Sequence, residues 1–452
     1  MKKRKNDADK KVNRRHDVNA PGPVAVFFIT LGAVLLLGTA GIFLWNVLGA
    51  KTDVPGGDTA PVNGQESVGS VEESTIQGEE EITDSLWEKI PEKEPQEQVA
   101  DAEQEGTAKE SRYGKVLQDA EYMKANRIIP WEGSEEGVVT LGFVGDILLD
   151  DEYAILANLL NRGGTIENGI SAEMLDVLQS VDILVANNEF PYTNRGVPTE
   201  GKTYTFRAQP DTVAYLHDMG VDLAVLANNH MFDFGEQGLL DTLDTLSAAG
   251  IPYIGAGRNL EEASAPVYYI VNDIKIAVVA ATQIERLDNP DTRGAGENVS
   301  GVFRCLDPAK LYEVVAKAKA ESDFVVVYMH WGTENVAEPD WAQLEQAPGL
   351  AKAGADLIIG DHPHCLQGIA YYEDTPVIYS LGNFWFNSKT VDTGMVQVEI
   401  DANGLKSFQF VPAIQSDCRV DLAYGAERER ILSYMRELSP KVNIDSEGYV
   451  TK

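Results

Sequence analysis

The segment Leu223-Ala-Val-Leu-Ala-Asn-Asn-His-Met-Phe-Asp-Phe-Gly235 decides how the rest of the chain is interpreted. Its apolar first half has the length of a buried strand. It ends abruptly in Asn228-Asn229-His230, before a polar turn and a helix-like stretch over 238–246. In an open α/β sheet, ligands bind in the crevice beyond the carboxyl ends of the strands. The polar cluster at this strand end is therefore a candidate functional site.

Four further apolar runs also end in polar residues. They are Val139–Val144 before Gly145-Asp146, Val181–Ala186 before Asn187-Asn188-Glu189, Phe324–Met329 before His330, and Asp356–Ile359 before Gly360-Asp361-His362-Pro363-His364. A single polar strand end is explained equally well by a turn whose side chains bond their own backbone. Five strand ends that all carry metal-ligand or acid–base residue types favour one shared site.

The segments between these runs have the periodicity of helices, and the runs themselves are apolar enough for strands that are buried on both faces. This alternation predicts a layered α/β domain over residues 138–416. Hairpins are expected at 268–279 and at 395–410, and helices at 308–322 and 341–353. A charged helix at 427–438 is expected in a C-terminal helical extension, residues 417–452.

The residue types at the strand ends indicate a metal centre. Carboxylate, amide and imidazole ligands without a thiolate suit Zn, Mn or Fe(II) better than Ca. Ligands from several strand ends are able to hold two ions about 3.5–4 Å apart, with a water nucleophile between them, which predicts hydrolysis. The candidate ligands are Asp146, Glu189, Asn229, His330, His362 and His364. His217, inside a helix-like stretch, is expected to be structural.

The N-terminus predicts a membrane anchor. Val24 to Trp45 is almost wholly apolar, and 22 residues span about 33 Å as a helix, against a hydrocarbon core of about 30 Å. Eight Lys/Arg precede it and acidic sequence follows, which places the N-terminus in the cytoplasm. We expect a basic cytoplasmic tail at 1–23, a single transmembrane helix at 24–47 and an extracellular domain. A cleaved signal peptide would carry a shorter apolar region.

An acidic stretch follows the apolar segment. Residues 51–110 hold 17 Asp/Glu against four Lys/Arg, within a chain of formal net charge −34. Such a composition buries too little apolar surface to fold, which predicts a disordered linker over 48–137. Nucleic acid is excluded as a partner by this charge. The three cysteines, Cys305, Cys365 and Cys418, form no zinc-binding spacing and no even set, so their disulfide state stays open.

The motifs, taken in order, resemble those of the poly-gamma-glutamate capsule synthesis protein (CapA) family, which is similar to calcineurin-like metallophosphoesterases. The matching motifs are Gly145-Asp146, Asn187-Asn188-Glu189, Asn228-Asn229-His230, His330-Trp331-Gly332-Thr333-Glu334, Gly360-Asp361-His362-Pro363-His364 and Ser380-Leu-Gly-Asn383-Phe384. The resemblance covers about Val138 to Ala413. It implies a four-layer α/β/β/α sandwich of the metallophosphoesterase type.

The resemblance also implies roles for the site residues. Asp146 and His364 would bind a first metal, Glu189 would bridge, and Asn229, His330 and His362 would complete a second. His230 would protonate the leaving group or stabilise developing charge. Asn187 and Glu334 would either hold the metal ligands in place or contact substrate. Asn383 would have one of these two roles or serve as a turn residue. Asp146-Ile147-Leu148 lacks the imidazole that phosphoesterases usually carry two residues after this Asp.

Three functions follow as hypotheses. The first is a membrane-anchored, extracytoplasmic metal-dependent hydrolase-like protein that acts in the synthesis, export or anchoring of poly-gamma-glutamate or a similar anionic surface polymer. Its partners would be that polymer or the polymer-synthesis machinery. The second is a cell-surface metallophosphodiesterase or phosphatase. The third is a non-catalytic component of capsule assembly that uses the pocket only for binding.

Overall fold

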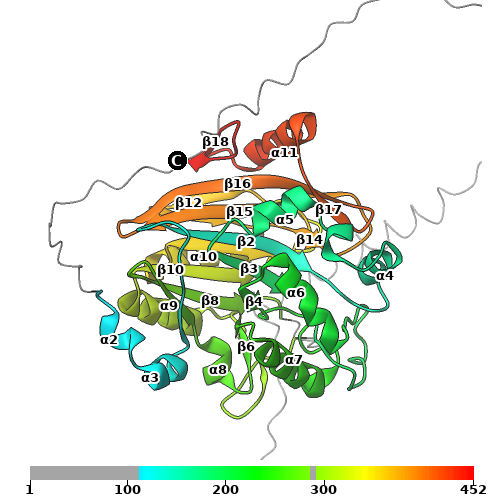
Figure 1. Ribbon diagram of the computed structural model, residues 1–452, viewed down its shortest axis with the longest axis horizontal. Helices are drawn as coiled ribbons and strands as arrows, with labels where there is room; N and C mark the ends of the chain where they lie inside the picture. Colours follow the sequence, from blue (N-terminus) through cyan, green and yellow to red (C-terminus); the bar gives the residue numbers. More distant parts are fainter. Residues whose placement is uncertain (1–110, 286–291) are drawn as a thin grey trace, which may run out of the picture. The chain divides into compact units, whose positions relative to one another are not determined.

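Two large β-sheets organise the folded part of the chain, of which the computed structural model describes residues 111–285 and 292–452 (Figure 1). The first sheet has seven strands in the order β1-β7-β8-β10-β11-β13-β12. Its strands are β1 (Ile128–Pro130), β7 (Val267–Val271), β8 (Ile274–Thr282), β10 (Phe324–His330), β11 (Leu357–Asp361), β13 (Thr375–Ile378) and β12 (Ile369–Tyr372). Strands β8, β10, β11 and β13 run parallel, with antiparallel partners nearer the edges.

The second sheet has eight strands, seven of them in the order β17-β16-β15-β2-β3-β4-β5, with β14 paired to β2. Its strands are β17 (Arg419–Leu422), β16 (Gly404–Ser416), β15 (Val391–Asp401), β2 (Val139–Ile147), β3 (Ile183–Asn188), β4 (Leu223–Val225), β5 (Tyr253–Ile254) and β14 (Asn383–Trp385). β2, β3, β4 and β5 are parallel. Two short pairs, β6 (Ala256–Gly257) with β9 (Gly301–Val302) and β18 (Asn443–Ile444) with β19 (Val450–Thr451), complete the strands of the described residues.

Alternating side chains pack the two sheets face to face. In β10, Phe324, Val326 and Tyr328 join a core that also contains Leu141 and Phe143 of β2. The intervening β10 residues point into a second core under helices on the outer face of the first sheet. A third core lies between the second sheet and its own helices. The layers are therefore helix, sheet, sheet and helix, the arrangement that the sequence resemblance implied.

The helices cover the outer faces and one end of the sandwich. The second sheet is covered by α4 (Ala154–Asn161), α5 (Ala172–Leu178), α6 (Ala214–Met219) and α7 (Gly235–Ala249), with the 3-10 turns η1 (Ile166–Asn168) and η2 (Pro210–Val213). The first sheet is covered by α8 (Leu260–Ser264), α9 (Ala309–Glu321) and α10 (Trp341–Ala353). Asp340 and Gln343 form a capping box that starts α10. Apolar residues of α11 (Gly425–Leu438) close the core between the sheets.

The hairpins and helices predicted from the sequence are present in the structure. The hairpins at 268–279 and 395–410 are β7–β8 and β15–β16. The expected helices at 308–322, 341–353 and 427–438 are α9, α10 and α11. All three cysteines are free, with Cys305 and Cys418 buried and Cys365 half-buried.

The folded part begins earlier than residue 138. The segment assigned to the linker contains α2 (Gly114–Leu117), α3 (Ala120–Ala125) and β1, which adds a parallel edge strand to β7. Arg112 and Tyr113 donate hydrogen bonds to Asp323, and this attaches the start of the described residues to the domain. The composition of this segment did not predict a folded structure, because its few apolar residues, such as Ile128, are buried only by tertiary contacts.

The C-terminal extension, residues 417–452, contains strands as well as the expected helix. Residues 419–422 form β17 of the second sheet, and the end of the chain pairs as β18 and β19. The cytoplasmic tail at 1–23, the membrane span at 24–47 and the linker up to residue 110 lie outside the described residues. Among residues 111–285 and 292–452, no helix has the length and apolar character needed to cross a membrane.

Replacing Tyr328 by Phe tests a hydrogen bond between the sheets. The buried Tyr328 hydroxyl on β10 donates to the Val144 carbonyl on β2, at 2.7 Å. Removing the hydroxyl leaves a buried carbonyl without this donor, and we expect the free energy of unfolding to fall by about 1–3 kcal/mol. Urea denaturation of the purified chain measures the change. The control is Tyr122→Phe, at a residue that is 49% exposed, and it should change the free energy of unfolding by less than about 0.5 kcal/mol. Equal effects would contradict the assignment.

Candidate metal centre

The five polar strand ends meet at one edge of the sandwich. Asp146 is near the end of β2, Glu189 follows β3, and Asn229 follows β4 in the second sheet. In the first sheet, His330 ends β10 and His362 follows β11. The carboxyl ends of parallel strands share an edge of their sheet, and here the edges of both sheets lie against each other. Contacts between the sheets, such as 2.8 Å between His330 Nε2 and Asn229 Oδ1, show the convergence.

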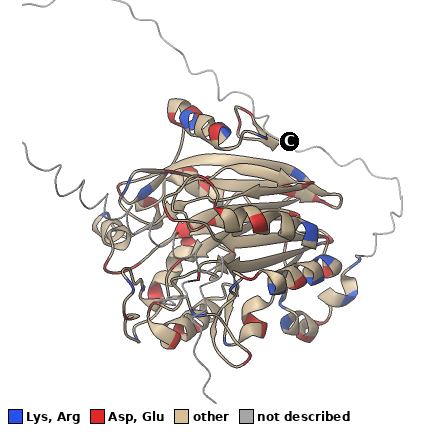
Figure 2. Cartoon of the chain, turned by 180° about the vertical axis from the view of Figure 1, so that it is seen from behind, with Lys and Arg blue, Asp and Glu red and all other residues tan. Residues whose placement is uncertain are grey.

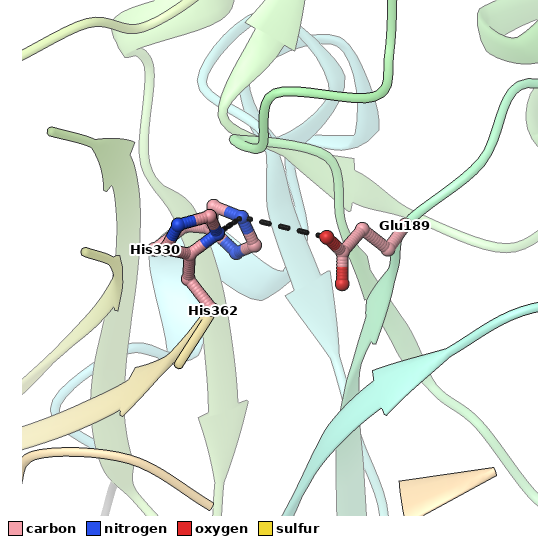
Figure 3. Close-up of side chains that lie close together, drawn as sticks. All are labelled: Glu189, His330 and His362. Carbon is pink, nitrogen blue, oxygen red and sulfur yellow. Dashed lines mark hydrogen bonds and ion pairs between the residues drawn. The ribbon is translucent and has the colours of Figure 1, made fainter. Parts of the chain in front are cut away.

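One group of donor atoms surrounds His330. Glu189, His330 and His362 offer ligand atoms within 4.8 Å of one another, and Figure 3 shows the three side chains facing a common point. His362 Nδ1 lies 3.0 Å and Glu189 Oε1 3.7 Å from His330 Nε2. When His330 donates its Nδ1–H to Asp361 Oδ1, at 2.8 Å, its Nε2 carries a lone pair. Lone pairs that gather at one point repel unless a cation lies between them.

A second group contains Asp146, Glu189 and His364, whose ligand atoms also lie within 4.8 Å of one another. His364 Nδ1 is 3.0 Å from Asp146 Oδ2 and 2.8 Å from Asn383 Oδ1. Asn187 donates to Asp146 Oδ1 at 2.9 Å, which orients that carboxylate. Asn383 reaches this group because β14 pairs with β2 at Asp146.

Glu189 belongs to both groups and is the least compensated residue of the site. Its side chain is fully buried, and neither carboxylate oxygen has a hydrogen-bond partner among the described residues. Burial, together with the nearby Asp146 and Asp361 carboxylates, raises the pKa of Glu189 well above its usual value. A buried charge without a partner costs several kcal/mol. A metal ion held beside Glu189 would remove that cost, so the donor set fits a divalent metal site.

Two of the three candidate histidine ligands, His330 and His362, are held in the state that suits metal binding. Burial lowers the pKa of His330 to about 3 and that of His362 well below its usual value, so both rings are neutral at pH 7. Neutral imidazole is the form that ligates metals. Burial also opposes the charge of His364, but its hydrogen bond to Asp146 raises the His364 pKa above the usual value. The same bond keeps the pKa of Asp146 low although burial raises it.

Backbone strain marks the loop after β11. His362 has a φ of 94° and His364 a φ of 57°, values that non-glycine residues rarely adopt. Such conformations cost of order 1–3 kcal/mol each and concentrate at functional sites.

The absence of a side chain at Gly145 allows a close backbone contact beside Asp146. A Cβ on Gly145 would lie 2.0 Å from the Gly382 carbonyl oxygen. Glycine at 145 therefore lets the Gly382 loop approach β2 and brings Asn383 to the site.

His230 lies beside the two groups and lines a cavity whose walls also include Asn229 and His362. Its Nε2 is 3.8 Å from Glu189 Oε1, and its Nδ1 is 2.7 Å from Asp233 Oδ2. The cavity has a volume of about 480 Å³, and its walls include Lys202, Asn229, His230, Glu334 and His362. Glu334 thus borders the space available to a ligand, as expected for a substrate-contacting residue. A substrate that enters this cavity meets His230, Asn229 and His362.

The structure brings together all six residues predicted as metal ligands: Asp146, Glu189, Asn229, His330, His362 and His364. His217 lies apart, on the exposed side of α6, where its Nε2 is 2.9 Å from the Ala249 carbonyl oxygen. Trp331, Trp385 and Phe384 are buried in the cores. Three residues of the site were not singled out from the sequence: Asp361, Asp233 and Lys202.

Two of these had a local signal in the sequence. Asp361 directly precedes His362, and Asp233 follows His230 by three residues in the segment that decided the fold. A carboxylate so close to an imidazole is a candidate to orient it. Lys202 comes from a polar loop without any such signal. Its position in the site follows from tertiary contacts alone.

Comparisons with known proteins show similarity to capsule synthesis proteins along most of the domain. The sequence profile described as "Bacterial capsule synthesis protein PGA_cap" matches residues 140–388. PGA biosynthesis protein CapA of Bacillus subtilis (strain 168) is 31% identical over 282 residues, which are 61% of this chain and 72% of that protein. Capsule biosynthesis protein CapA of Bacillus anthracis is 30% identical over 299 residues, 64% of this chain and 70% of that protein.

A probable polyglutamine synthesis accessory protein of Mycobacterium tuberculosis is 31% identical over 291 residues, 60% of this chain and 77% of that protein. Among solved structures, TT1561 of Thermus thermophilus matches 60% of this chain and 97% of its own, with 8% identity and a TM-score of 0.33. A 5′-nucleotidase from Candida albicans matches 61% of this chain and 54% of its own, with 10% identity and a TM-score of 0.32. TM-scores this low support no conclusion.

The profile match spans more than half of the 452 residues and contains every predicted metal ligand. It also begins within β2 and ends just after β14, so it covers the strands that build the site in both sheets. The chain therefore belongs to the bacterial capsule synthesis protein family PGA_cap.

Proposed function

We propose that this chain is a metal-dependent hydrolase-like protein that acts in the synthesis, export or anchoring of poly-gamma-glutamate or a similar anionic surface polymer. The family supports the polymer class, because relatives are named as proteins of PGA biosynthesis, capsule biosynthesis and polyglutamine synthesis. The polymer-synthesis machinery is the expected partner. Residues 24–47 would anchor the chain in the cell membrane as a single span, with the basic N-terminus in the cytoplasm and the folded domain outside.

The observation that carries the hydrolase proposal is the buried, unpartnered Glu189 carboxylate between two groups of ligand atoms in the described part of the chain. Asp146 and His364 would hold one divalent ion, Asn229, His330 and His362 the other, with Glu189 shared. Mn, Zn and Fe suit these nitrogen and oxygen donors. A bound pair of such ions supplies a water nucleophile near neutral pH and polarises the bond to be cleaved.

The chain's own residues would orient these ligands and handle the proton. Asp361 holds the His330 ring, and Asn187 holds Asp146, through the hydrogen bonds already described. Asn228 donates to Asn187 Oδ1 at 3.1 Å and so orients its amide. His230, with Nε2 at the edge of the cavity, would give a proton to the leaving group. Burial of the whole group excludes water from these hydrogen bonds.

The motif order and the four layers support a relationship to metallophosphoesterases, so a phosphoester is one candidate for the bond cleaved and an amide of the polymer is the other. Repulsion between an acidic protein and a polyanion is reduced only in part by the distribution of charge. Residues 51–110 hold 17 of the 71 Asp/Glu, and the remaining acidic residues of the described part are interspersed with basic ones (Figure 2). The bound ions would add local positive charge at the cavity.

Metal content tests the centre directly. We expect the purified full-length chain to hold about two transition-metal ions per molecule, because the two ligand groups share one bridging carboxylate. Glu189→Gln removes the charge shared by both ions and should reduce the content to one ion or fewer, measured by elemental analysis. Glu345→Gln, an exposed position on α10, is the matched control and should keep the wild-type content. A wild-type chain that binds no metal, with Mn, Zn or Fe supplied, would refute the hydrolase proposal and favour the non-catalytic assembly component.

A variant of His230 tests proton transfer separately from metal binding. With bis(p-nitrophenyl) phosphate, an alkyl phosphodiester and poly-gamma-glutamate as substrates, we expect His230→Asn to lower kcat on its true substrate about 10²–10⁴-fold. The metal content should stay unchanged because His230 lies outside both groups of ligand atoms. Turnover of phosphodiesters alone would favour the cell-surface phosphodiesterase. Unchanged kcat in the variant would rule out a proton-transfer role for His230.

A further inference from the structure

The cavity beside the candidate metal centre is lined by loops from both sheets. Lys202 and Asn229 belong to loops that follow β3 and β4 of the second sheet, and Glu334 and His362 to loops that follow β10 and β11 of the first. Two of these residues, Asn229 and His362, are candidate metal ligands. Ligand pockets in proteins have volumes of about 300–1,000 Å³. At about 480 Å³, the cavity has room for one small unit of a polymer next to the metal centre.

One positive charge lines the cavity. The Lys202 side chain is only 5% exposed, yet it forms part of the cavity wall. Its Nζ donates to the Asn229 backbone carbonyl and to Asp233 Oδ1, and these two bonds fix the position of the ammonium group. An ammonium group has three N–H donors. The third donor of Lys202 has no acceptor among residues 111–285 and 292–452, which leaves it for an acidic group of a ligand.

One negative charge borders the cavity without a partner. Glu334 is exposed, and its carboxylate forms no hydrogen bond or ion pair with another described residue. The next residue holds this loop in place, because the Asn335 backbone N–H donates to the Pro363 carbonyl at 2.7 Å. The other acidic side chain of the cavity, Glu285, lies 3.7 Å from Arg304 Nη1, so its charge is balanced. Glu334 is therefore the unbalanced negative charge of the cavity wall.

A ligand that matches these two charges carries both an acidic and a cationic group. Lys202 binds a carboxylate through a charge-assisted hydrogen bond, and Glu334 binds an ammonium group in the same way. Poly-gamma-glutamate carries both groups on one carbon atom only in its amino-terminal unit, which has a free α-ammonium beside its α-carboxylate. In every other unit the α-nitrogen is part of an amide. Only the carboxylate of such a unit is charged, and Glu334 repels it.

We propose that the cavity binds the amino-terminal unit of poly-gamma-glutamate, with Lys202 on its α-carboxylate and Glu334 on its α-ammonium, which deepens the proposed function and rests on it for the bond that is cleaved. The γ-carbonyl, at the far end of the bound side chain, faces the candidate metal centre. Water adds its hydroxyl group to the γ-carbonyl carbon as the C–N bond breaks. The proton of that water goes to the departing nitrogen, which becomes the new amino terminus. Each turnover releases one glutamate.

Three small acids test the recognition without any reaction. Compared with glutamate, 4-aminobutyrate lacks only the α-carboxylate, and glutarate lacks only the α-ammonium. Isothermal titration calorimetry with the purified full-length chain, supplied with Mn, measures the three dissociation constants, with both enantiomers of glutamate. We expect one enantiomer of glutamate to bind about tenfold more tightly than either analogue, because each missing group removes one charge-assisted hydrogen bond. Equal affinities for the three acids would overturn the proposal.

Glu334→Gln tests the binding of the ammonium group. The variant keeps the shape of the side chain but not its charge, so the preference for glutamate over glutarate should fall below about twofold, while the preference over 4-aminobutyrate stays about tenfold. Because Glu334 is exposed, the substitution leaves folding intact. Glu338→Gln, at an exposed residue of the same loop outside the cavity wall, is the matched control and should keep both preferences. An unchanged preference over glutarate in Glu334→Gln would contradict the assignment.

Lys202→Met tests the binding of the carboxylate and should give the opposite pattern. The preference for glutamate over 4-aminobutyrate should disappear, and the preference over glutarate should remain. General damage to the site would instead lower the affinity for all three acids together. Lys202 is buried against Asp233, so urea denaturation first checks that the variant folds, and the Glu334 comparison decides if it does not. A folded variant that keeps its preference over 4-aminobutyrate would refute the role of Lys202.

Turnover connects this recognition with the proposed hydrolysis. γ-Glutamyl-p-nitroanilide carries the free ammonium group and its N-acetyl derivative does not, so the wild-type kcat/KM should be about tenfold higher for the first and equal for both in Glu334→Gln. Cleavage of amides or phosphodiesters with equal binding of the three acids would reject the recognition and leave the hydrolase proposal standing. Preferential binding of glutamate without cleavage of any substrate would reject the hydrolase proposal and leave the recognition standing.

Discussion

The buried Glu189 carboxylate is the constraint on which the rest of this structure depends. Its two oxygens lie among acceptor atoms and imidazole lone pairs rather than among donors. A protein interior tolerates such an arrangement only when a cation balances it or when packing elsewhere holds it in place. Here strand ends of both sheets and the strained loop after β11 meet at that one carboxylate.

Because each sheet supplies part of the ligand set, the geometry of the centre depends on how the sheets pack. Asp146, Glu189 and Asn229 belong to the second sheet, and His330 and His362 to the first. The core between the sheets sets their separation, and the Tyr328 to Val144 hydrogen bond ties β10 to β2 close to the strand ends. A shift of one sheet against the other would separate the two halves of the site.

Residues behind the ligands determine their orientation. Asp361 acts on His330, Asn187 on Asp146, and Asp233 on His230, each through a hydrogen bond within one sheet or one turn. The candidate ligands lie close to one another, and these residues fix their direction through hydrogen bonds. This arrangement explains why so many polar side chains are buried at one edge of an otherwise apolar sandwich.

The sequence by itself determined the identity of the strand ends, the hairpins, the main helices and the six candidate ligands. It could do so because apolar runs and the polar residues that end them are local patterns. It did not reveal the folded segment at 111–137, where isolated apolar residues such as Ile128 are buried only by tertiary contacts. Nor did it single out Lys202, which reaches Asp233 from a loop 31 residues away in the chain. Those features, the distances between ligands and the direction of each imidazole come from tertiary contacts, which bring together residues far apart in sequence and leave no periodic signal in the chain.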